Sequence, residues 1–112
     1  MNAIRAVLVF ALVIASSLTE ATMIIGSGGA SCGTWTADRQ RNESRSQINQ
    51  AWVLGFVAGY TIYKPPQDSM PKPTDARAVM LWIDNYCDAN PQMDISDAAK
   101  ALIEDLTGRA PR

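Results

Sequence analysis

The sequence contains no histidine, and this absence excludes several kinds of chemistry. Its 112 residues include 10 Lys and Arg, 11 Asp and Glu, and no His. Without imidazole the chain has no Ser-His or Cys-His catalytic pair, no histidine metal ligand and no histidine-based pH switch. The nearly balanced charge, −1 overall, provides no basic field that would attract nucleic acid. A non-enzymatic, cofactor-free protein with protein partners is therefore favoured.

A long apolar run occurs only at the start of the sequence. A short basic segment at 1–5 precedes an apolar run at 6–18, and small residues follow at Thr19 and Ala21. This layout predicts a cleaved secretory signal peptide over 1–21, with cleavage after Ala30 as the alternative. The run is too short for a membrane-spanning helix, so we expect no stable membrane insertion after cleavage. A retained membrane anchor is the competing interpretation.

Cysteine is also scarce, with two in the whole chain, Cys32 and Cys87. In an exported protein, two cysteines predict one disulfide. A loop of this size closed by a disulfide stabilises a fold by about 4 kcal/mol in the chain-entropy description. Lipidation of Cys32 is the alternative, because small residues precede it, and it would leave Cys87 unpaired.

The remaining segments predict an all-α domain: a small bundle of three main helices stapled by the disulfide. We expect a flexible Gly- and Ser-rich arm at 22–36, a helical domain at 37–108 and a polar tail at 109–112. The first helix covers about 37–64 and ends at a proline-rich connector. Pro91 ends the second helix, and Gly108 caps the third.

The first helix carries two glycines, Gly55 and Gly59, four residues apart. Each costs about 1 kcal/mol relative to Ala inside a helix, so we expect another backbone to come close there. A close helix crossing within the chain and a contact between two copies both fit this spacing. Gly55 and Gly59 are therefore candidates for a surface that binds a protein client or forms a homodimer. Helical spacing favours the core for Trp35, Trp52, Trp82 and the tyrosines, with a ligand-stacking set as the alternative.

Charges of opposite sign lie in different parts of the chain. Arg39, Arg41 and Arg45 lie near the start of the first helix, where the helix dipole disfavours cations. Acidic residues concentrate in the last third: Asp84, Asp88, Asp94, Asp97, Glu104 and Asp105. We expect a salt-bridged face, within or between chains, with solvated charges as the alternative. Asp84 and Asp88 share one helix face, but we expect them to face solvent rather than form an acid/base pair in a cleft.

Three short segments resemble the HdeA/HdeB family of small exported helical proteins of Gram-negative bacteria. They read Ser-Cys-Gly-Thr-Trp at 31–35, Ala-Trp-Val-Leu-Gly-Phe at 51–56 and Tyr-Cys-Asp-Ala-Asn-Pro-Gln at 86–92. The resemblance implies a periplasmic, ATP-independent acid-stress chaperone with a single disulfide between the corresponding cysteines. It also implies that Trp52, Phe56 and Tyr60 join Gly55 and Gly59 in the candidate client or dimer surface. Family members are dimers near neutral pH and hold denaturing clients on apolar surface that acid exposes. The longer connector at 65–73 departs from the family layout and puts the dimer geometry in doubt.

The acidic residues named above are the candidate pH-sensitive groups of this mechanism. Carboxylates that are paired in the folded state have lowered pKa values, and the stability they provide is lost as the pH falls. The runner-up function comes from a weaker likeness to Tai-type immunity proteins, which would make the chain an inhibitor of one toxin or enzyme partner. An exported enzyme would require a cleft that the sequence does not indicate.

Overall fold

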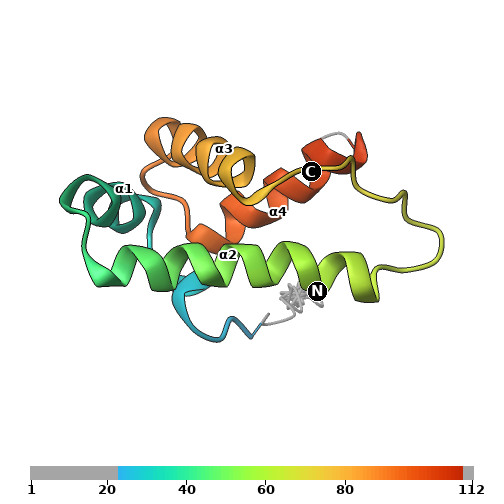
Figure 1. Cartoon of the computed structure of the whole chain (residues 1–112), viewed down its shortest axis with the longest axis horizontal. Helices are drawn as coiled ribbons and strands as arrows, with labels where there is room; N and C mark the ends of the chain where they lie inside the picture. Colours follow the sequence, from blue (N-terminus) through green and yellow to red (C-terminus); the bar gives the residue numbers. More distant parts are fainter. Residues whose placement is uncertain (1–22, 110–112) are drawn as a thin grey trace, which may run out of the picture.

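The structure, a computed structural model, describes residues 23–109, and this part of the chain is helical without any strand. Four helices follow a short 3₁₀ turn (Figure 1). They are η1 (Ser27–Gly29), α1 (Cys32–Arg41), α2 (Ser44–Tyr63), α3 (Ala76–Ala89) and α4 (Ile95–Thr107). The predicted all-α class and the Cys32–Cys87 disulfide are confirmed. The predicted signal peptide and most of the predicted tail lie outside the described residues.

The bundle has four helices rather than the predicted three, because the helix expected over 37–64 is interrupted. Asn42 adopts the left-handed conformation, with φ 51°, and separates α1 from α2. Asparagine is one of the few residues other than glycine that enters this region at low cost. The Asn42 N–H donates to the carbonyl of Arg39, and the Glu43 N–H donates to that of Asp38. These bonds close the end of α1 and turn the chain into α2.

The prediction of a flexible arm at 22–36 is wrong for its last third, because residues 32–36 belong to α1. The cap of α1 is Ser31, whose Oγ accepts a hydrogen bond from the Thr34 N–H at 3.1 Å. The Cys32 N–H donates to the Met93 carbonyl at 2.7 Å, which attaches the start of α1 to the turn before α4. Ser31 is therefore a helix cap, and the helical domain begins before residue 37.

The ends of α3 and α4 follow from local stereochemistry. Asp75 caps α3 by accepting a hydrogen bond from the Ala78 N–H at 2.8 Å, and the helix ends before Pro91. Asp94 and Asp97 form a reciprocal capping box at the start of α4. Gly108, with φ 70°, ends α4 in the left-handed conformation. The predicted ends of these two helices are confirmed.

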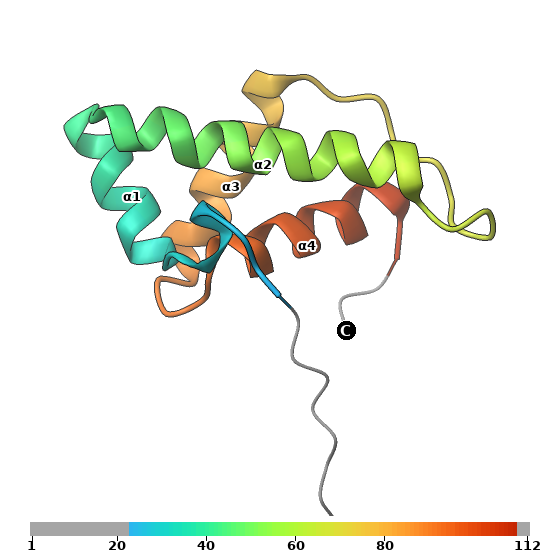
Figure 2. The same ribbon diagram turned by 90° about the horizontal axis from the view of Figure 1, so that it is seen from below.

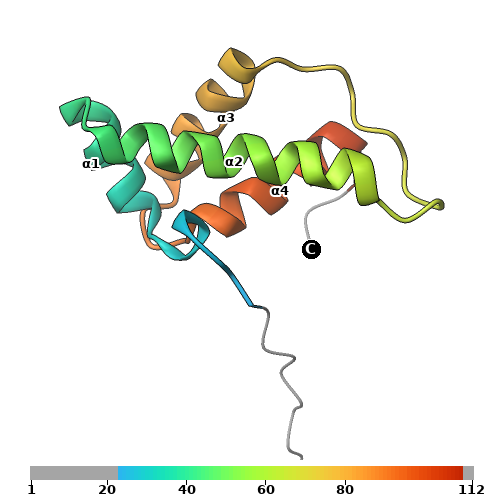
Figure 3. The ribbon, with the colours of Figure 1, turned by 60° about the horizontal axis from the view of Figure 1, so that its bottom comes forward.

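The core lies where α1, α3 and α4 meet beneath α2. In Figures 2 and 3 the long helix α2 crosses one side of the molecule, with α3 and α4 behind it. The side chains that fill the space between the helices are almost completely buried: Cys32, Trp35, Val53, Val79, Ile83, Cys87, Ile95, Ala98 and Leu102. The proline-rich connector between α2 and α3 is not helical, as predicted, and its Lys72 N–H donates to the Leu106 carbonyl at 2.9 Å.

No helix within residues 23–109 has the length and apolar character needed to cross a bilayer.

One position in η1 tests how closely this turn packs on α2. Gly28 is buried, and a Cβ atom at this position would overlap the indole ring of Trp52. We expect Gly28→Ala to lower the free energy of unfolding by about 1–3 kcal/mol, as overpacking typically does. Urea unfolding followed by tryptophan fluorescence measures this loss. Gly29→Ala is the matched control, because a Cβ there meets nothing within 4 Å, and equal stability of the two variants would contradict the packing.

Candidate functional site

The side of α2 that faces away from the core is uncovered within the described chain. Residues at alternating steps of three and four line this side, and all of them are exposed. We call this set the outer face of α2: Ser44, Ile48, Ala51, Gly55, Ala58 and Ile62. The side chains of Ile48 and Ile62 are 61% and 72% exposed. In Figure 3 the middle part of α2 runs in front of α3 and α4.

The two glycines of α2 do not mark a helix crossing within the chain. A Cβ atom built at Gly55 or Gly59 would meet no atom within 4 Å. The expectation of a close intramolecular crossing at the glycines is therefore wrong, because no other element of the described chain lies within contact distance of such a Cβ. The backbone at these positions is accessible to another molecule.

The aromatic members of the predicted surface lie beside the outer face rather than on it. Trp52 donates from its indole N–H to the Ile25 carbonyl at 2.7 Å and stacks on Phe56 with ring centroids 5.5 Å apart. The Tyr60 hydroxyl donates to Asp68 at 2.9 Å. All three aromatic side chains are half-buried. Gly55 lies on the outer face, and Gly59 lies at its edge.

The outer face also lacks charge. From Ser46 to Tyr63 the sequence contains no Asp, Glu, Lys or Arg over five turns of helix. Exposed helix surfaces normally carry charged side chains, whereas the centres of protein interfaces are depleted in them. The steps of three and four between small residues and isoleucines, together with this uncharged run, could have located the face from sequence. The prediction instead followed the aromatic residues.

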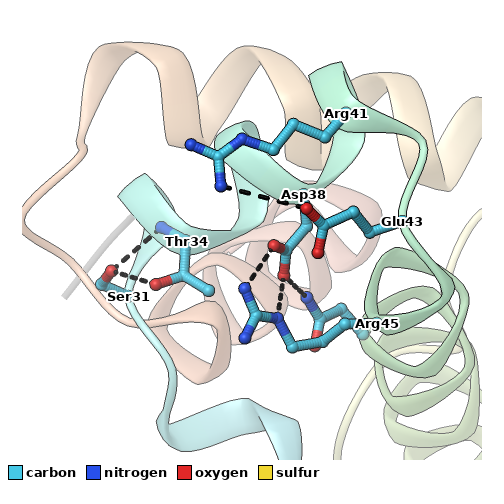
Figure 4. Close-up of polar contacts among 7 residues, drawn as sticks. Ser31, Thr34, Asp38, Arg41, Glu43 and Arg45 are labelled. Atoms are coloured by element: carbon cyan, nitrogen blue, oxygen red, sulfur yellow. Dashed lines mark hydrogen bonds and ion pairs between the residues drawn. The ribbon is translucent and has the colours of Figure 1, made fainter.

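A buried carboxylate closes the end of α1 onto α2. Asp38 is 0% exposed and accepts hydrogen bonds from Arg45 Nε and Nη2, both at 2.7 Å (Figure 4). Asn49 Nδ2 donates a third hydrogen bond at 3.0 Å. The hydrogen bonds from Arg45 hold the pKa of Asp38 below its ordinary value, although burial acts in the opposite direction. Sequence analysis missed this site, because the pairing depends on the turn at Asn42.

A second carboxylate joins α1 to α3. Asp84 accepts hydrogen bonds from Arg39 Nη2 at 2.6 Å and from the indole N–H of Trp35 at 2.8 Å. The Asp84 side chain is 28% exposed, so the expectation that it faces solvent is wrong: an arginine and a tryptophan of α1 cover it. The expected pairing between the early arginines and the acidic last third is present here. Asp88, by contrast, is exposed.

The other acidic residues of the last third have different partners. Asp94 and Asp97 cap α4, and Asp97 also pairs with Lys100 Nζ at 2.9 Å. The hydrogen bond from Lys100 lowers the pKa of Asp97. Glu104 and Asp105 line a cleft between α3 and α4. The six acidic residues therefore do not form a single face.

The disulfide lies at the opposite end of α1 from the Asp38 site. Cys32 is the first residue of α1, Cys87 lies near the end of α3, and both are completely buried. The helix α1 is thus attached covalently at its start and by ionised carboxylates in its second half. Only the second attachment depends on pH.

The described residues provide no metal site, since no group of three or more Cys, Asp or Glu side chains within 23–109 is placed to hold an ion. No protein family, curated protein or solved structure matches the chain.

Replacement of the buried carboxylate tests the pH-dependent attachment. We expect Asp38→Asn to lower the free energy of unfolding at neutral pH, because Arg45 then loses its ionised partner. A lowered folded-state pKa stabilises the protein above the unfolded value, near pH 4, and this stabilisation is lost as the pH falls through the folded pKa. The difference between wild type and variant should therefore shrink in strong acid, as measured by urea unfolding at several pH values.

Asp88→Asn is the matched control, because it removes an exposed carboxylate from α3 and should change stability little at any pH. A difference between wild type and Asp38→Asn that stays constant from neutral to strongly acid pH would contradict the role of Asp38.

Proposed function

We propose that this chain is an exported, non-enzymatic protein-binding protein of the acid-stress chaperone type, acting in the periplasm, with the outer face of α2 as its binding surface. The observation that carries the proposal is this face itself, which is apolar, uncharged over five turns and covered by no other part of the described chain. A contiguous exposed apolar face of this kind is typical of a protein interaction site. The likeness of three segments to the HdeA/HdeB family supports the specific function.

At neutral pH the partner that this face fits is a second copy of the chain. Counting outward from Gly55, Ala51 and Ala58 come first, and Ile48 and Ile62 follow at equal distances of seven residues. Two α2 helices packed antiparallel around a two-fold axis at Gly55 would place Ile48 of one copy against Ile62 of the other. The small residues would let the two backbones approach closely, and the antiparallel order suits the helix dipoles.

Acid would release the second half of α1 while its start stays attached. Protonation of Asp38 removes the ionised partner of Arg45, which keeps its positive charge and is left without a counter-ion at the α1–α2 turn. Since Cys32 remains bonded to Cys87, the opened chain stays compact. Movement of α1 would expose Trp35, which is 1% exposed in the folded chain. Clients would then bind to this new surface together with the outer face of α2.

An arginine on the outer face tests the proposal, because its charge persists in acid. We expect Ala58→Arg to raise the dimer dissociation constant at least tenfold at neutral pH, as measured by sedimentation. The same variant should lose most of its ability to suppress aggregation of acid-denatured model proteins, as measured by light scattering. Asn85→Arg places the same charge on an exposed position of α3 and is the matched control.

The two readouts test separate parts of the proposal. A wild-type chain that is monomeric at all concentrations but suppresses aggregation contradicts the dimer alone. A chain that leaves acid-induced aggregation unchanged contradicts the chaperone function.

A second candidate, an inhibitor or immunity protein for one cognate partner, is favoured by one observation. The outer face is fully formed in the folded chain, so binding would need no opening by acid. This function would show as one partner bound in fixed stoichiometry at neutral pH, released by Ala58→Arg, with no suppression of acid-induced aggregation.

A further inference from the structure

A cleft between α3 and α4 has a composition unlike that of the outer face of α2. Its volume is about 580 Å³, and its lining combines aromatic, apolar and charged side chains. Trp82 and Tyr86 of α3 form one wall, and Met93 adds apolar surface. The charged residues come from α4 and the residue that follows its cap: Asp97, Lys100, Glu104, Asp105 and Arg109. None of these residues belongs to the outer face of α2.

The aromatic wall is ordered by helix geometry. Trp82 and Tyr86 stand four residues apart on α3, so their side chains lie on the same face of the helix. Their rings stack with centroids 5.6 Å apart and an interplanar angle of 13°. Both side chains are half-buried, which leaves part of their aromatic surface open to the cleft. Aromatic surface of this kind attracts cations, particularly guanidinium groups.

The charges around the cleft leave an excess of negative charge. Lys100 Nζ pairs with Asp97 at 2.9 Å, and Arg109 Nη1 pairs with Asp68 at 3.5 Å. Arg109 Nη2 also donates to the Tyr60 hydroxyl at 3.1 Å. Glu104 and Asp105 form no ion pair with any residue in 23–109. The two basic residues are thus neutralised by neighbours, whereas these two carboxylates remain available to a ligand.

We propose that this cleft binds an arginine side chain of a protein partner. The guanidinium group would lie against the Trp82 and Tyr86 rings and within reach of the Glu104 and Asp105 carboxylates. The aliphatic stem of the arginine would contact the rings and Met93, which suits a side chain that combines an apolar stem with a charged end. Arginine is preferred over lysine, because its planar group both stacks on aromatic rings and pairs with carboxylates.

The environment of Tyr86 agrees with this assignment. Burial raises the pKa of Tyr86, and the negative charges of Asp97 and Glu104 raise it further, against the opposing charge of Lys100. The field at the aromatic wall is therefore negative on balance, and a cation placed there would be stabilised by it.

The test uses a short peptide with blocked ends and one central arginine, together with the same peptide carrying citrulline, its uncharged analogue. The chain has three tryptophans, whose indole N–H signals can be separated by NMR. We expect the arginine peptide to shift the Trp82 signal in a saturable way and to leave those of Trp35 and Trp52 unchanged. Citrulline should bind at least tenfold more weakly, because it retains the shape but lacks the charge.

Two double variants locate the binding on the protein. Glu104→Gln with Asp105→Asn should weaken binding of the arginine peptide at least tenfold. Glu43→Gln with Asp88→Asn removes the same charge from exposed positions elsewhere, and this control should retain binding. Equal losses in the two double variants would show a general effect of net charge and would overturn the site.

Two further results would distinguish an arginine of a protein partner from a small cation and from no ligand at all. Ethylguanidinium supplies the side-chain group alone, and binding as tight as that of the peptide would overturn the assignment to a protein partner. Absence of any saturable Trp82 shift would overturn the site altogether. Because Ala58→Arg changes only the outer face of α2, it should bind the arginine peptide normally, so failure of the chaperone proposal would not affect this result.

Discussion

The disulfide between Cys32 and Cys87 is the constraint on which the arrangement of the helices depends. It joins the first residue of α1 to the end of α3, across 55 positions of sequence. In a small domain such as the one formed by residues 23–109, the hydrophobic core alone provides limited stability. The covalent bond places Trp35 of α1 over Ile83 and the other buried residues of α3 and α4. Without it, α1 would be held mainly by polar contacts, since few of its residues are apolar and buried.

Because of those polar contacts, the stability of the fold depends on pH, which would not be so for apolar contacts. Asp38 and Asp84 accept hydrogen bonds from Arg45 and Arg39, which keep their positive charge at every accessible pH, and each also accepts one from an uncharged side chain. A carboxylate in such a position stabilises the folded state when ionised and loses most of this effect when protonated. A larger apolar contact at the same place would have stabilised α1 equally in acid. The helix α1 is therefore held by a disulfide that does not depend on pH and by carboxylate contacts that do.

Much of the fold could be predicted from sequence, because many of its determinants act locally. The two cysteines predicted one disulfide, Pro91 ends a helix by steric exclusion, and Gly108 readily adopts a positive φ. The break at Asn42 could not be predicted in this way. Asparagine occurs in helices and in left-handed turns alike, and the choice here is coupled to the burial of Asp38 among partners up to 11 residues away. Such pairings exist only once the turn has formed.

The outer face of α2 could be located only in part from the sequence. Gly55 and Gly59 indicate that a backbone can approach, but their spacing does not say whether that backbone belongs to the same chain. Trp52 was placed on the surface from the family resemblance, yet Gly28 of η1 packs against its ring and the Ile25 carbonyl accepts a hydrogen bond from its indole N–H. The position of η1 depends on the attachment of Cys32, which is distant in sequence from α2. Tertiary structure thus decides which side of an amphipathic helix is left uncovered.

The two proposed surfaces depend on different interactions. The outer face of α2 lies in a segment without charge from Ser46 to Tyr63, so binding there would depend on apolar contact. The cleft between α3 and α4 would attract a cation through the Glu104 and Asp105 carboxylates and the rings of Trp82 and Tyr86. Because the two surfaces share no residue, a partner on one would not compete with a partner on the other.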